Sequence, residues 1–362
     1  MIFRMSGNKK KILHIINGMG SGGAEKVIMN WYRNIDRTIY QFDFLIRSNQ
    51  TFYKEEIKDK GGAVYQVAPF PQKAIKNFWE TYCFLKNNRH EYDAIHVHAN
   101  SLVYIFPLLI AKALGIKKRI IHIHSTKAGG RVAGFIHRIN RMIIRFIATD
   151  LVACSQKAGR FAFGDYDFWE IKNGIDLLEY KSYRDNNKNG GEYIIGHVGR
   201  FLPVKNHKFI IDIFYHLYSE NHQYKLILIG IGPLFHKIKE YVKKKGLERG
   251  VLFLGERDDV NRLLGKMDLI CFPSKYEGVP LVVLESQAAG VKVLMSDTIT
   301  SDVIISPLVQ VESLKSSEDV WCAHIKKMLS ENIYFDIEKG FKENSLDIQS
   351  TVLKLTEVYA GE

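Results

Sequence analysis

Two glutamates stand eight residues apart in the stretch that says most about chemistry, PSKYEGVPLVVLESQAAG at 273–290. Glu277 lies beside Gly278 and Pro280, which predicts a loop, and Glu285 lies inside an apolar run typical of a helix. A carboxylate accepts two hydrogen bonds from hydroxyls, which suits the diols of ribose or of a hexose. Backbone N–H groups at the start of that helix suit a phosphate. The stretch therefore predicts a site for a phosphorylated sugar.

Two cations follow the apolar run 193–198, which predicts a strand. Arg200 comes two residues after this run, and Lys205 follows near the expected start of a helix. Ligands of open α/β sheets bind at the carboxyl ends of the strands. Cations and free helix N–H groups attract anions at such a position. Arg200 and Lys205 therefore predict an anion site, although a solvated basic surface has the same composition.

A glycine cluster, GMGSGG at 18–23, follows the first apolar run of the chain. Glycines let backbone N–H groups approach a phosphate, and the string matches the G-x-G-x-x-G fingerprint of dinucleotide-binding proteins. That fingerprint expects an acidic residue at the end of the second strand. Here Asp43 comes too early, and Arg47 suits only a 2′-phosphate. An NADP-dependent oxidoreductase stays an alternative, as does a glycine turn without a ligand.

Two histidine pairs lie on expected strands, His96 with His98 and His122 with His124. Residues two apart on a strand point to the same face. His124 stands at a carboxyl end, where it would open into the ligand crevice. No acidic residue or cysteine accompanies either pair, and the four cysteines show no CxxC spacing. We therefore predict no metal site and a functional role for His124, the alternative being a hydrogen-bonded core histidine.

The first half of the chain alternates short apolar or β-branched runs with helical patterns. Such alternation predicts βαβ units and a parallel sheet. The expected strands cover 11–17, 42–46, 63–67, 94–98, 119–124 and 151–155. The expected helices begin near residue 24 and cover 77–87 and 101–114.

The segment 181–192, KSYRDNNKNGGE, is polar and lacks an apolar period, which predicts a linker between domains. The alternation then restarts. The expected strands cover 193–198, 225–229, 251–254, 269–272 and 291–295. The expected helices cover 207–218, 234–245, 281–289 and 348–359. We therefore predict an α/β protein with two Rossmann-like, doubly wound parallel-sheet domains, the first over 1–180 and the second over 190–344.

The net charge of +12 belongs to one half of the chain. Residues 1–180 hold 27 Lys and Arg against 15 Asp and Glu, whereas residues 181–362 hold 24 of each. This asymmetry predicts an anionic partner, with lipid headgroups and nucleic acid as candidates, or else a merely basic face. Within 129–147, arginines at sevenfold spacing alternate with apolar residues, which is typical of a helix at a membrane interface. The same apolar face can equally pack on the sheet.

The sequence gives no sign of a membrane span or of a secretory leader. No apolar stretch reaches the roughly 18 residues that a spanning helix needs. The first apolar run has no cleavage pattern after it and reads as a strand. Scattered cysteines suit a reducing compartment. We therefore expect a cytoplasmic protein.

These motifs, taken in order over nearly the whole chain, resemble those of retaining glycosyltransferases of the GT-B fold, family 4 type. The run SDTITSD at 296–302 also resembles the EpsF-like exopolysaccharide and capsule branch. The motifs that carry the resemblance are Gly22 to Glu25, His124 to Thr126, Asn173 to Asp176, Gly199 with Arg200 and Lys205, Gly230 to Pro233, and the pair Glu277 and Glu285.

The resemblance implies two Rossmann-like domains that face each other across a cleft. The N-terminal domain would bind the acceptor and would be joined by the C-terminal helix segment 345–362, and residues 190–344 would bind the nucleotide sugar. Among the catalytic residues, Arg200 and Lys205 would stabilise the departing β-phosphate. His124 would contact the donor sugar near its C6 hydroxyl, and Glu277 would bind the hydroxyls of that sugar.

The resemblance also implies a set of donor-binding residues. Glu285 would bind the ribose hydroxyls, and Gly22 and Gly23 would approach the diphosphate and the reacting sugar. The remaining donor-binding residues would shape the pocket or offer backbone groups: Gly230, Gly232, Pro233, Gly278, Val279, Pro280 and Leu281.

The implied reaction moves a hexose from a nucleotide diphosphate sugar, UDP by resemblance, to a glycan or polyprenyl-diphosphate-linked acceptor with retention. Paired cations can offset the leaving-group charge without Mg²⁺, and no DxD-type metal motif is evident. We therefore expect no metal, no cofactor and no nucleic acid, and we assign no catalytic base. A lipid-linked acceptor would bring the enzyme to the inner face of the cell membrane and its anionic surface.

One departure from the family pattern concerns the donor sugar. Many relatives carry a Gly-Gly pair after the strand that ends near Met295, where this chain has Ser296 and Asp297. Two further alternatives stay open beside the oxidoreductase, which leaves the two glutamates unexplained. One is a basic non-enzymatic scaffold, although no nucleic-acid motif is recognisable. The other is a sugar-nucleotide 2-epimerase on the same fold.

Overall fold

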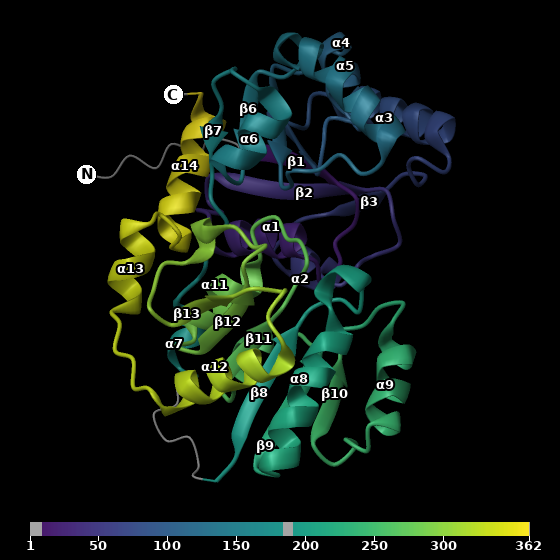
Figure 1. The fold of residues 1–362 in the computed structure, drawn as a ribbon. Helices are drawn as coiled ribbons and strands as arrows, with labels where there is room; N and C mark the ends of the chain where they lie inside the picture. Colours follow the sequence, from purple (N-terminus) through teal and green to yellow (C-terminus); the bar gives the residue numbers. More distant parts are fainter. Residues whose placement is uncertain (1–8, 184–190, 362) are drawn as a thin grey trace, which may run out of the picture. The chain divides into compact units, whose positions relative to one another are not determined.

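The computed structural model describes residues 9–183 and 191–361 and divides them into two compact units (Figure 1). Unit 1 runs to Gly174 and resumes at Ile348, and unit 2 comprises Ile175–Asp347. Most of the linker predicted at 181–192 falls on 184–190, outside the described residues.

Unit 1 is built on a seven-stranded parallel sheet of order β3-β2-β1-β4-β5-β6-β7. β2 is buried along its whole length and β1 over its last five residues, as expected where helices cover both faces of a parallel sheet. The strands are β1 Lys10–Ile16, β2 Tyr40–Ile46, β3 Val64–Gln66, β4 Ala94–Ala99, β5 Lys118–Ile123, β6 Asp150–Ala153 and β7 Trp169–Glu170.

The helices of unit 1 include the last helix of the chain, which packs against α1. Their amphipathic patterns place apolar residues such as Val27, Ile28 and Trp31 of α1 in the core. The helices are α1 Gly23–Asn34, α2 Lys54–Asp59, α3 Ala74–Asn88, α4 Phe106–Ala113, α5 Arg131–Ile147, α6 Gln156–Phe163 and α14 Ile348–Ala360.

Unit 2 is built on a six-stranded parallel sheet of order β10-β9-β8-β11-β12-β13. Leu226 and Leu228 of β9, Phe214 of α8 (His207–Glu220) and Trp321 of α12 (Glu318–Ser330) share one buried core. The strands are β8 Tyr193–Val198, β9 Tyr224–Ile229, β10 Val251–Gly255, β11 Leu269–Phe272, β12 Lys292–Ser296 and β13 Val309–Glu312.

The helical segments of unit 2 alternate with these strands. α11 is buried over all of its residues, in keeping with its continuous apolar run. The segments are α7 Leu178–Lys181, η1 Pro203–Lys205, α8 His207–Glu220, α9 Phe235–Lys244, α10 Val260–Leu264, α11 Leu281–Ala288, η2 Ser301–Val303, α12 Glu318–Ser330 and α13 Ile337–Glu343.

Each sheet reverses its strand order at one place, between β1 and β4 in unit 1 and between β8 and β11 in unit 2. Reversal of this kind defines a doubly wound fold, and ligands bind in the crevice at the carboxyl ends of the two strands that flank it. The prediction of two Rossmann-like parallel-sheet domains is confirmed.

Several predicted boundaries differ from the structure. The helix expected at 101–114 begins only at Phe106, because Pro107 is tolerated in a first turn but not further along. Unit 2 begins at Ile175 rather than near 190 and ends at Asp347 rather than 344. Ile175 pairs with Asp347 in a parallel bridge, and its N–H donates to the carbonyl of Leu346. These contacts place 175–180 and 345–347 with the second unit.

Candidate functional site

Lys205 and Glu277 meet at the reversal point of the sheet in unit 2. Lys205 ends η1, which follows β8, and Glu277 lies in the loop after β11. Lys205 Nζ lies 2.7 Å from Glu277 Oε1, and each side chain is 16% exposed. A half-buried ion pair at two adjacent strand ends is a charged, ligand-accessible group at the place where this fold binds ligands.

The local backbone positions Lys205. Gly199 leaves room for its stem, because a Cβ there would lie 3.1 Å from Lys205 Cε. The ammonium lies 4.8 Å from the centre of the Phe272 ring, within cation–π range. The N–H of Lys275 donates to the carbonyl of Val204 at 2.8 Å, so the loops that carry Lys205 and Glu277 are joined.

Gly230 and Gly232 allow two loops to touch through their backbones. A Cβ on Gly230 would lie 2.2 Å from the carbonyl oxygen of Gly199, and one on Gly232 would lie 2.7 Å from the nitrogen of Phe201. Phe201 N–H donates to the carbonyl of Ile231. The Gly230–Pro233 motif is therefore needed to bring the loop after β9 against the loop that carries Arg200.

Arg200 differs from Lys205 in its surroundings. Its side chain is exposed, and within the described part of the chain no ion pair is recorded for it. Pro233 is also exposed. Arg200 therefore offers a solvated cation close in sequence to the half-buried Lys205.

The predicted donor loop leads directly into α11. Gly278 and Val279 are half-buried, Pro280 is the residue before the helix, and Leu281 begins it. Glu285 lies one turn inside α11 and is only 4% exposed. A carboxylate so deeply buried is uncommon, in line with the sequence argument for a specific role.

In the segment where this chain departs from the Gly-Gly pattern, Ser296 and Thr298 both bond to the loop that carries Glu277. Ser296 Oγ donates to the carbonyl of Ser274 at 2.5 Å, and Thr298 Oγ1 donates to the same oxygen at 2.7 Å. Ser274 lies in the loop that carries Glu277, between β11 and α11. The two hydroxyls therefore tie this loop to the end of β12.

Two histidines near Lys205 were not predicted as site residues. His197 is buried in β8, where its Nδ1 donates to the carbonyl of Cys271 at 2.9 Å. His207 begins α8 and stacks on Phe201 with ring centres 4.0 Å apart. Burial, with a smaller effect of the Lys205 charge, lowers the pKa of His207 to about 4. The one sequence signal that could have indicated a place for His207 in this site is its position two residues after Lys205.

The glycine loop of unit 1 folds back on the segment after β2. Met19 N–H donates to the carbonyl of Gln50, and a Cβ on Gly18 would lie 2.3 Å from Ser48 Oγ. Gly22 precedes α1, and Gly23 begins it as an exposed residue. Gly22 and Gly23 thus lie at a helix start, whereas Gly18 and Gly20 serve the packing of the turn.

Arg47, the residue that could have suited a 2′-phosphate, is engaged elsewhere. Its guanidinium lies 3.9 Å from the centre of the Tyr104 ring and 5.5 Å from that of Phe70. Burial lowers the pKa of Arg47. A stacked, half-buried guanidinium of this kind gives no support to the dinucleotide alternative.

The structure brings the two predicted histidine pairs together and adds His14 of β1. One ring nitrogen each of His14, His96 and His98, and likewise of His98, His122 and His124, lie within 4.8 Å of one another. All are buried except His124, which is half-buried. His14 was not among the predicted site residues, and the five histidines lie closer together than two separate pairs suggested.

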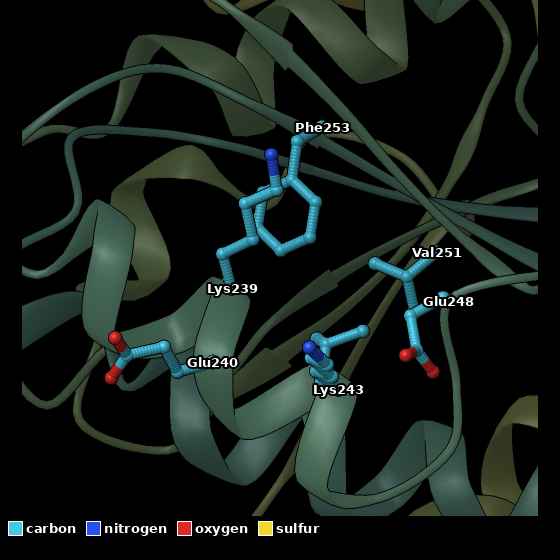
Figure 2. A pocket seen from close by; sticks show the side chains of 7 residues that line it. Lys239, Glu240, Lys243, Glu248, Val251 and Phe253 are labelled. Atoms are coloured by element: carbon cyan, nitrogen blue, oxygen red, sulfur yellow. The ribbon is translucent and has the colours of Figure 1, made fainter.

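A pocket of about 340 Å³ lies away from these residues, in unit 2 (Figure 2). Val251 and Phe253 of β10 lie among charged side chains of α9 and of the following turn. None of the site residues predicted from the sequence lines this pocket.

Among the helices of the described ranges, none combines the length and the apolar character that a membrane span requires.

Residues 180–345 match the family of glycosyl transferases group 1. The chain is 33% identical over 347 residues to the putative glycosyltransferase EpsF of Bacillus subtilis, covering 89% of this chain and 88% of EpsF. It is 23% identical to the capsular polysaccharide biosynthesis glycosyltransferase CapH of Staphylococcus aureus, over 97% and 99% of the two chains. Anabaena HepE, solved with UDP and glucose, matches with a TM-score of 0.76 at 18% identity, over 98% of this chain and all of HepE.

The fold and these matches define a GT-B glycosyltransferase, and the chain belongs to the group 1 glycosyl transferases. Within that family it falls in the exopolysaccharide and capsule branch, as its motifs predict.

Proposed function

We propose that this glycosyltransferase moves a hexose from a UDP-sugar to a glycan or polyprenyl-diphosphate-linked acceptor, with retention of the anomeric configuration. The observation that carries the proposal is the Lys205–Glu277 pair at the reversal point of unit 2. The choice of UDP is supported by HepE, which has been solved with UDP and with UDP-glucose.

In this proposal, unit 2 stabilises the leaving UDP. Breaking the bond between the anomeric carbon and the phosphate oxygen leaves negative charge on the β-phosphate. Lys205 releases Glu277 to meet that charge, the exposed Arg200 supplies a second cation, and the amides at the start of α11 donate hydrogen bonds. These groups make a divalent metal unnecessary, so the reaction proceeds in EDTA.

The carboxylates recognise hydroxyls. Glu277, once released from Lys205, accepts hydrogen bonds from the donor sugar, and Glu285 accepts them from the ribose. Gly230, Gly232 and Pro233 bound the base and phosphate, and the amides of Gly278, Val279 and Leu281 face the phosphate. In unit 1, Gly22, Gly23 and His124 contact the donor sugar, with Gly22 and Gly23 reaching its diphosphate as well.

Retention follows from attack on the face that the leaving group occupies. The acceptor hydroxyl oxygen bonds to the anomeric carbon, the bond from that carbon to the phosphate oxygen breaks, and the departing phosphate takes the hydroxyl proton. No side chain is needed as the base. Stabilised leaving-group charge then lowers the barrier directly.

A second part of the proposal is peripheral binding to the cytoplasmic face of the cell membrane through α5. His137 anchors the buried side of α5, because it accepts from Leu102 N–H and donates to the carbonyl of Phe161. The opposite side is apolar and exposed, with Val132 at 74%, Met142 at 69% and Phe135 at 64%. The alternative, that these residues pack on the sheet, is therefore wrong.

The charges beside this apolar side are basic. Arg131, Arg138 and Arg145 are exposed. α4 contacts both α3 and α5, and α3 carries the exposed apolar residues Ile75 and Trp79. An apolar face bordered by arginines suits an anionic bilayer surface. Docking there would bring the enzyme to a lipid-linked acceptor.

Calorimetric titration in EDTA tests the donor class. We expect binding of UDP and none of NADPH. Binding of NADPH alone would overturn the proposal in favour of an oxidoreductase, and binding of neither would favour the scaffold. GDP bound in place of UDP would correct the base and leave the reaction class standing.

A further inference from the structure

Five histidines and one tyrosine of unit 1 form a continuous hydrogen-bonded path. Starting at the half-buried end, His124 Nε2 lies 2.9 Å from His98 Nδ1, and His98 Nε2 lies 2.9 Å from His14 Nδ1. His14 Nε2 then lies 3.4 Å from the hydroxyl of Tyr359 in α14.

The path continues beyond Tyr359. The same hydroxyl lies 2.9 Å from His96 Nδ1, and His96 Nε2 lies 3.3 Å from His122 Nδ1. The last atom, His122 Nε2, is buried and has no hydrogen-bond partner among the described residues. At the other end, the ring of His124 hydrogen-bonds to described residues only through Nε2.

Neutral imidazole donates through one nitrogen and accepts through the other, and a hydroxyl donates one hydrogen. Every link between histidines joins an Nδ1 to an Nε2, and Tyr359 likewise joins an Nδ1 to an Nε2. Tyr359 is buried, and an unpaired buried hydroxyl hydrogen is costly, so the hydroxyl donates to one of its two histidine partners and accepts from the other. With that condition, the direction of one hydrogen bond sets the direction of all five. Either all five histidines carry their proton on Nδ1, or all five carry it on Nε2.

The inner end decides between these two states. If the protons sit on Nε2, His122 buries an N–H donor without an acceptor. If they sit on Nδ1, His122 buries only a lone pair, and the outer end offers the Nδ1–H of half-buried His124 to a ligand. Orphaned buried N–H groups are rarer than unsatisfied acceptors, so the second state is favoured.

We propose that all five histidines are held as Nδ1–H tautomers, and that this path makes His124 a hydrogen-bond donor toward an oxygen of the donor substrate. The last clause rests on the proposed function, whereas the shared tautomer does not. Tyr359, His14, His98, His96 and His122 are positioning residues in this arrangement. The C-terminal helix thereby contributes to the chemistry of a residue on β5's carboxyl end.

The path requires neutral rings, and burial supplies them. Burial lowers the pKa of His14 to about 3 and that of His124 to about 4, and it holds those of His96, His98 and His122 well below their usual range.

A metal ion is the competing explanation for clustered histidines. His14, His96 and His98 already use both ring nitrogens in the path. A metal bound by these rings would displace at least one of those bonds, so the hydrogen-bonded path is the better account.

Nitrogen NMR of protein labelled with ¹⁵N-histidine tests the tautomers, because bare and protonated ring nitrogens have distinct shifts. The chain contains internal references. His137 must carry Nε2–H, since its Nδ1 accepts from Leu102, and His197 must carry Nδ1–H, since that atom donates to Cys271. We expect the five signals to match His197. Nε2–H at any of the five, or a mixture of tautomers, would overturn the proposal.

Tyr359→Phe tests the coupling, because it removes one oxygen and keeps the ring. His96 Nδ1 then loses its partner, and either direction of the His96–His122 bond leaves one donor unpaired. We expect these two histidines to become tautomer mixtures while His14, His98 and His124 stay Nδ1–H. Tyr104→Phe removes another buried hydroxyl, which bonds Asn77, and should leave all five unchanged. Unchanged His96 and His122 in Tyr359→Phe would refute the coupling.

The readout needs neither donor nor acceptor. Shared Nδ1–H tautomers in a protein that binds no nucleotide sugar would refute the role of His124 toward a donor and keep the path. Mixed tautomers in a fully active enzyme would refute the path and keep the proposed function.

Discussion

Lys205 Nζ and Glu277 Oε1 lie 2.7 Å apart, although they belong to loops that follow different strands, β8 and β11. These strands are hydrogen-bonded neighbours at the point where the strand order reverses. The pair joins the two loops that a nucleotide diphosphate would contact in this fold.

Removing the Lys205 ammonium tests its catalytic role. We expect Lys205→Met to lower transfer about 10²- to 10³-fold, as the loss of one preorganised donor to a developing anion does. It also leaves the half-buried Glu277 unpaired, so the protein should lose stability. Adding Glu277→Gln should restore stability and not activity. Lys208→Met, an exposed lysine in α8, is the control, and a Lys205→Met enzyme as active as this control would contradict the role.

Gly230→Ala tests the backbone contact between loops. Its Cβ would meet the carbonyl oxygen of Gly199 at 2.2 Å, so we expect a loss of about 1–3 kcal/mol in the free energy of unfolding and weaker UDP binding. Gly134→Ala is the control, because it lies in α5 with nothing within 4 Å of the added Cβ. That change should stabilise by up to about 1 kcal/mol. Urea unfolding of both measures the difference, and equal effects would rule the contact out.

How stability varies with pH tests the burial of His207. The pKa of His207 is about 4 in the folded protein and about 6.5 when unfolded. The unfolded chain therefore binds more protons between these values, and stability is full above about pH 6.5 and falls toward pH 4. The loss is on the order of 1 kcal/mol per pH unit for this group.

His207→Phe should remove this contribution. The new ring can keep the stacking on Phe201, and both nitrogens of His207 lack hydrogen-bond partners among the described residues. Unfolding in urea from pH 7.5 to 5 should show a flatter pH dependence for the variant. A slope equal to that of the parent would show that His207 is not held neutral.

Flotation with vesicles that contain phosphatidylglycerol tests the α5 surface. We expect the protein to float at low salt and to sediment at high salt, where the charges are screened. Phe135→Ser with Met142→Ser should abolish flotation. Leu353→Ser in α14 removes an apolar side chain of comparable exposure, 62%, and should have no effect. A parent protein that stays wholly in the soluble fraction at low salt would contradict membrane binding.

The sequence predicted most strands, because β-branched and apolar runs are long enough in a buried parallel sheet to be visible. It also predicted an anion site at Lys205 and a loop at Glu277, and the family resemblance assigned both residues to one nucleotide-sugar site. It did not predict their contact, which depends on the space left by Gly199 and on the bond from Lys275 to Val204.

Other features of the structure could not be predicted from hydrophobic patterning. The apolar face of α5 faces solvent because His137 and Asn140 bond to Leu102 on the opposite face, and hydrophobicity alone assigns burial to the wrong side. His14 stood as a lone polar residue in an apolar run and gave no sign of its two partners on other elements. The sequence analysis also missed several elements of the structure: β7, β13, α2, α6, α7, α10, α12 and α13. β7 and β13 are only two and four residues long, too short for a clear period.

Hydrogen exchange measured by mass spectrometry, with and without UDP in EDTA, tests most directly that unit 2 binds the donor at the ends of β8, β9 and β11. We predict slower exchange in 199–206, 230–235 and 274–285 of unit 2. Protection confined to the Gly18–Gly23 loop, with those segments unchanged, would contradict the account.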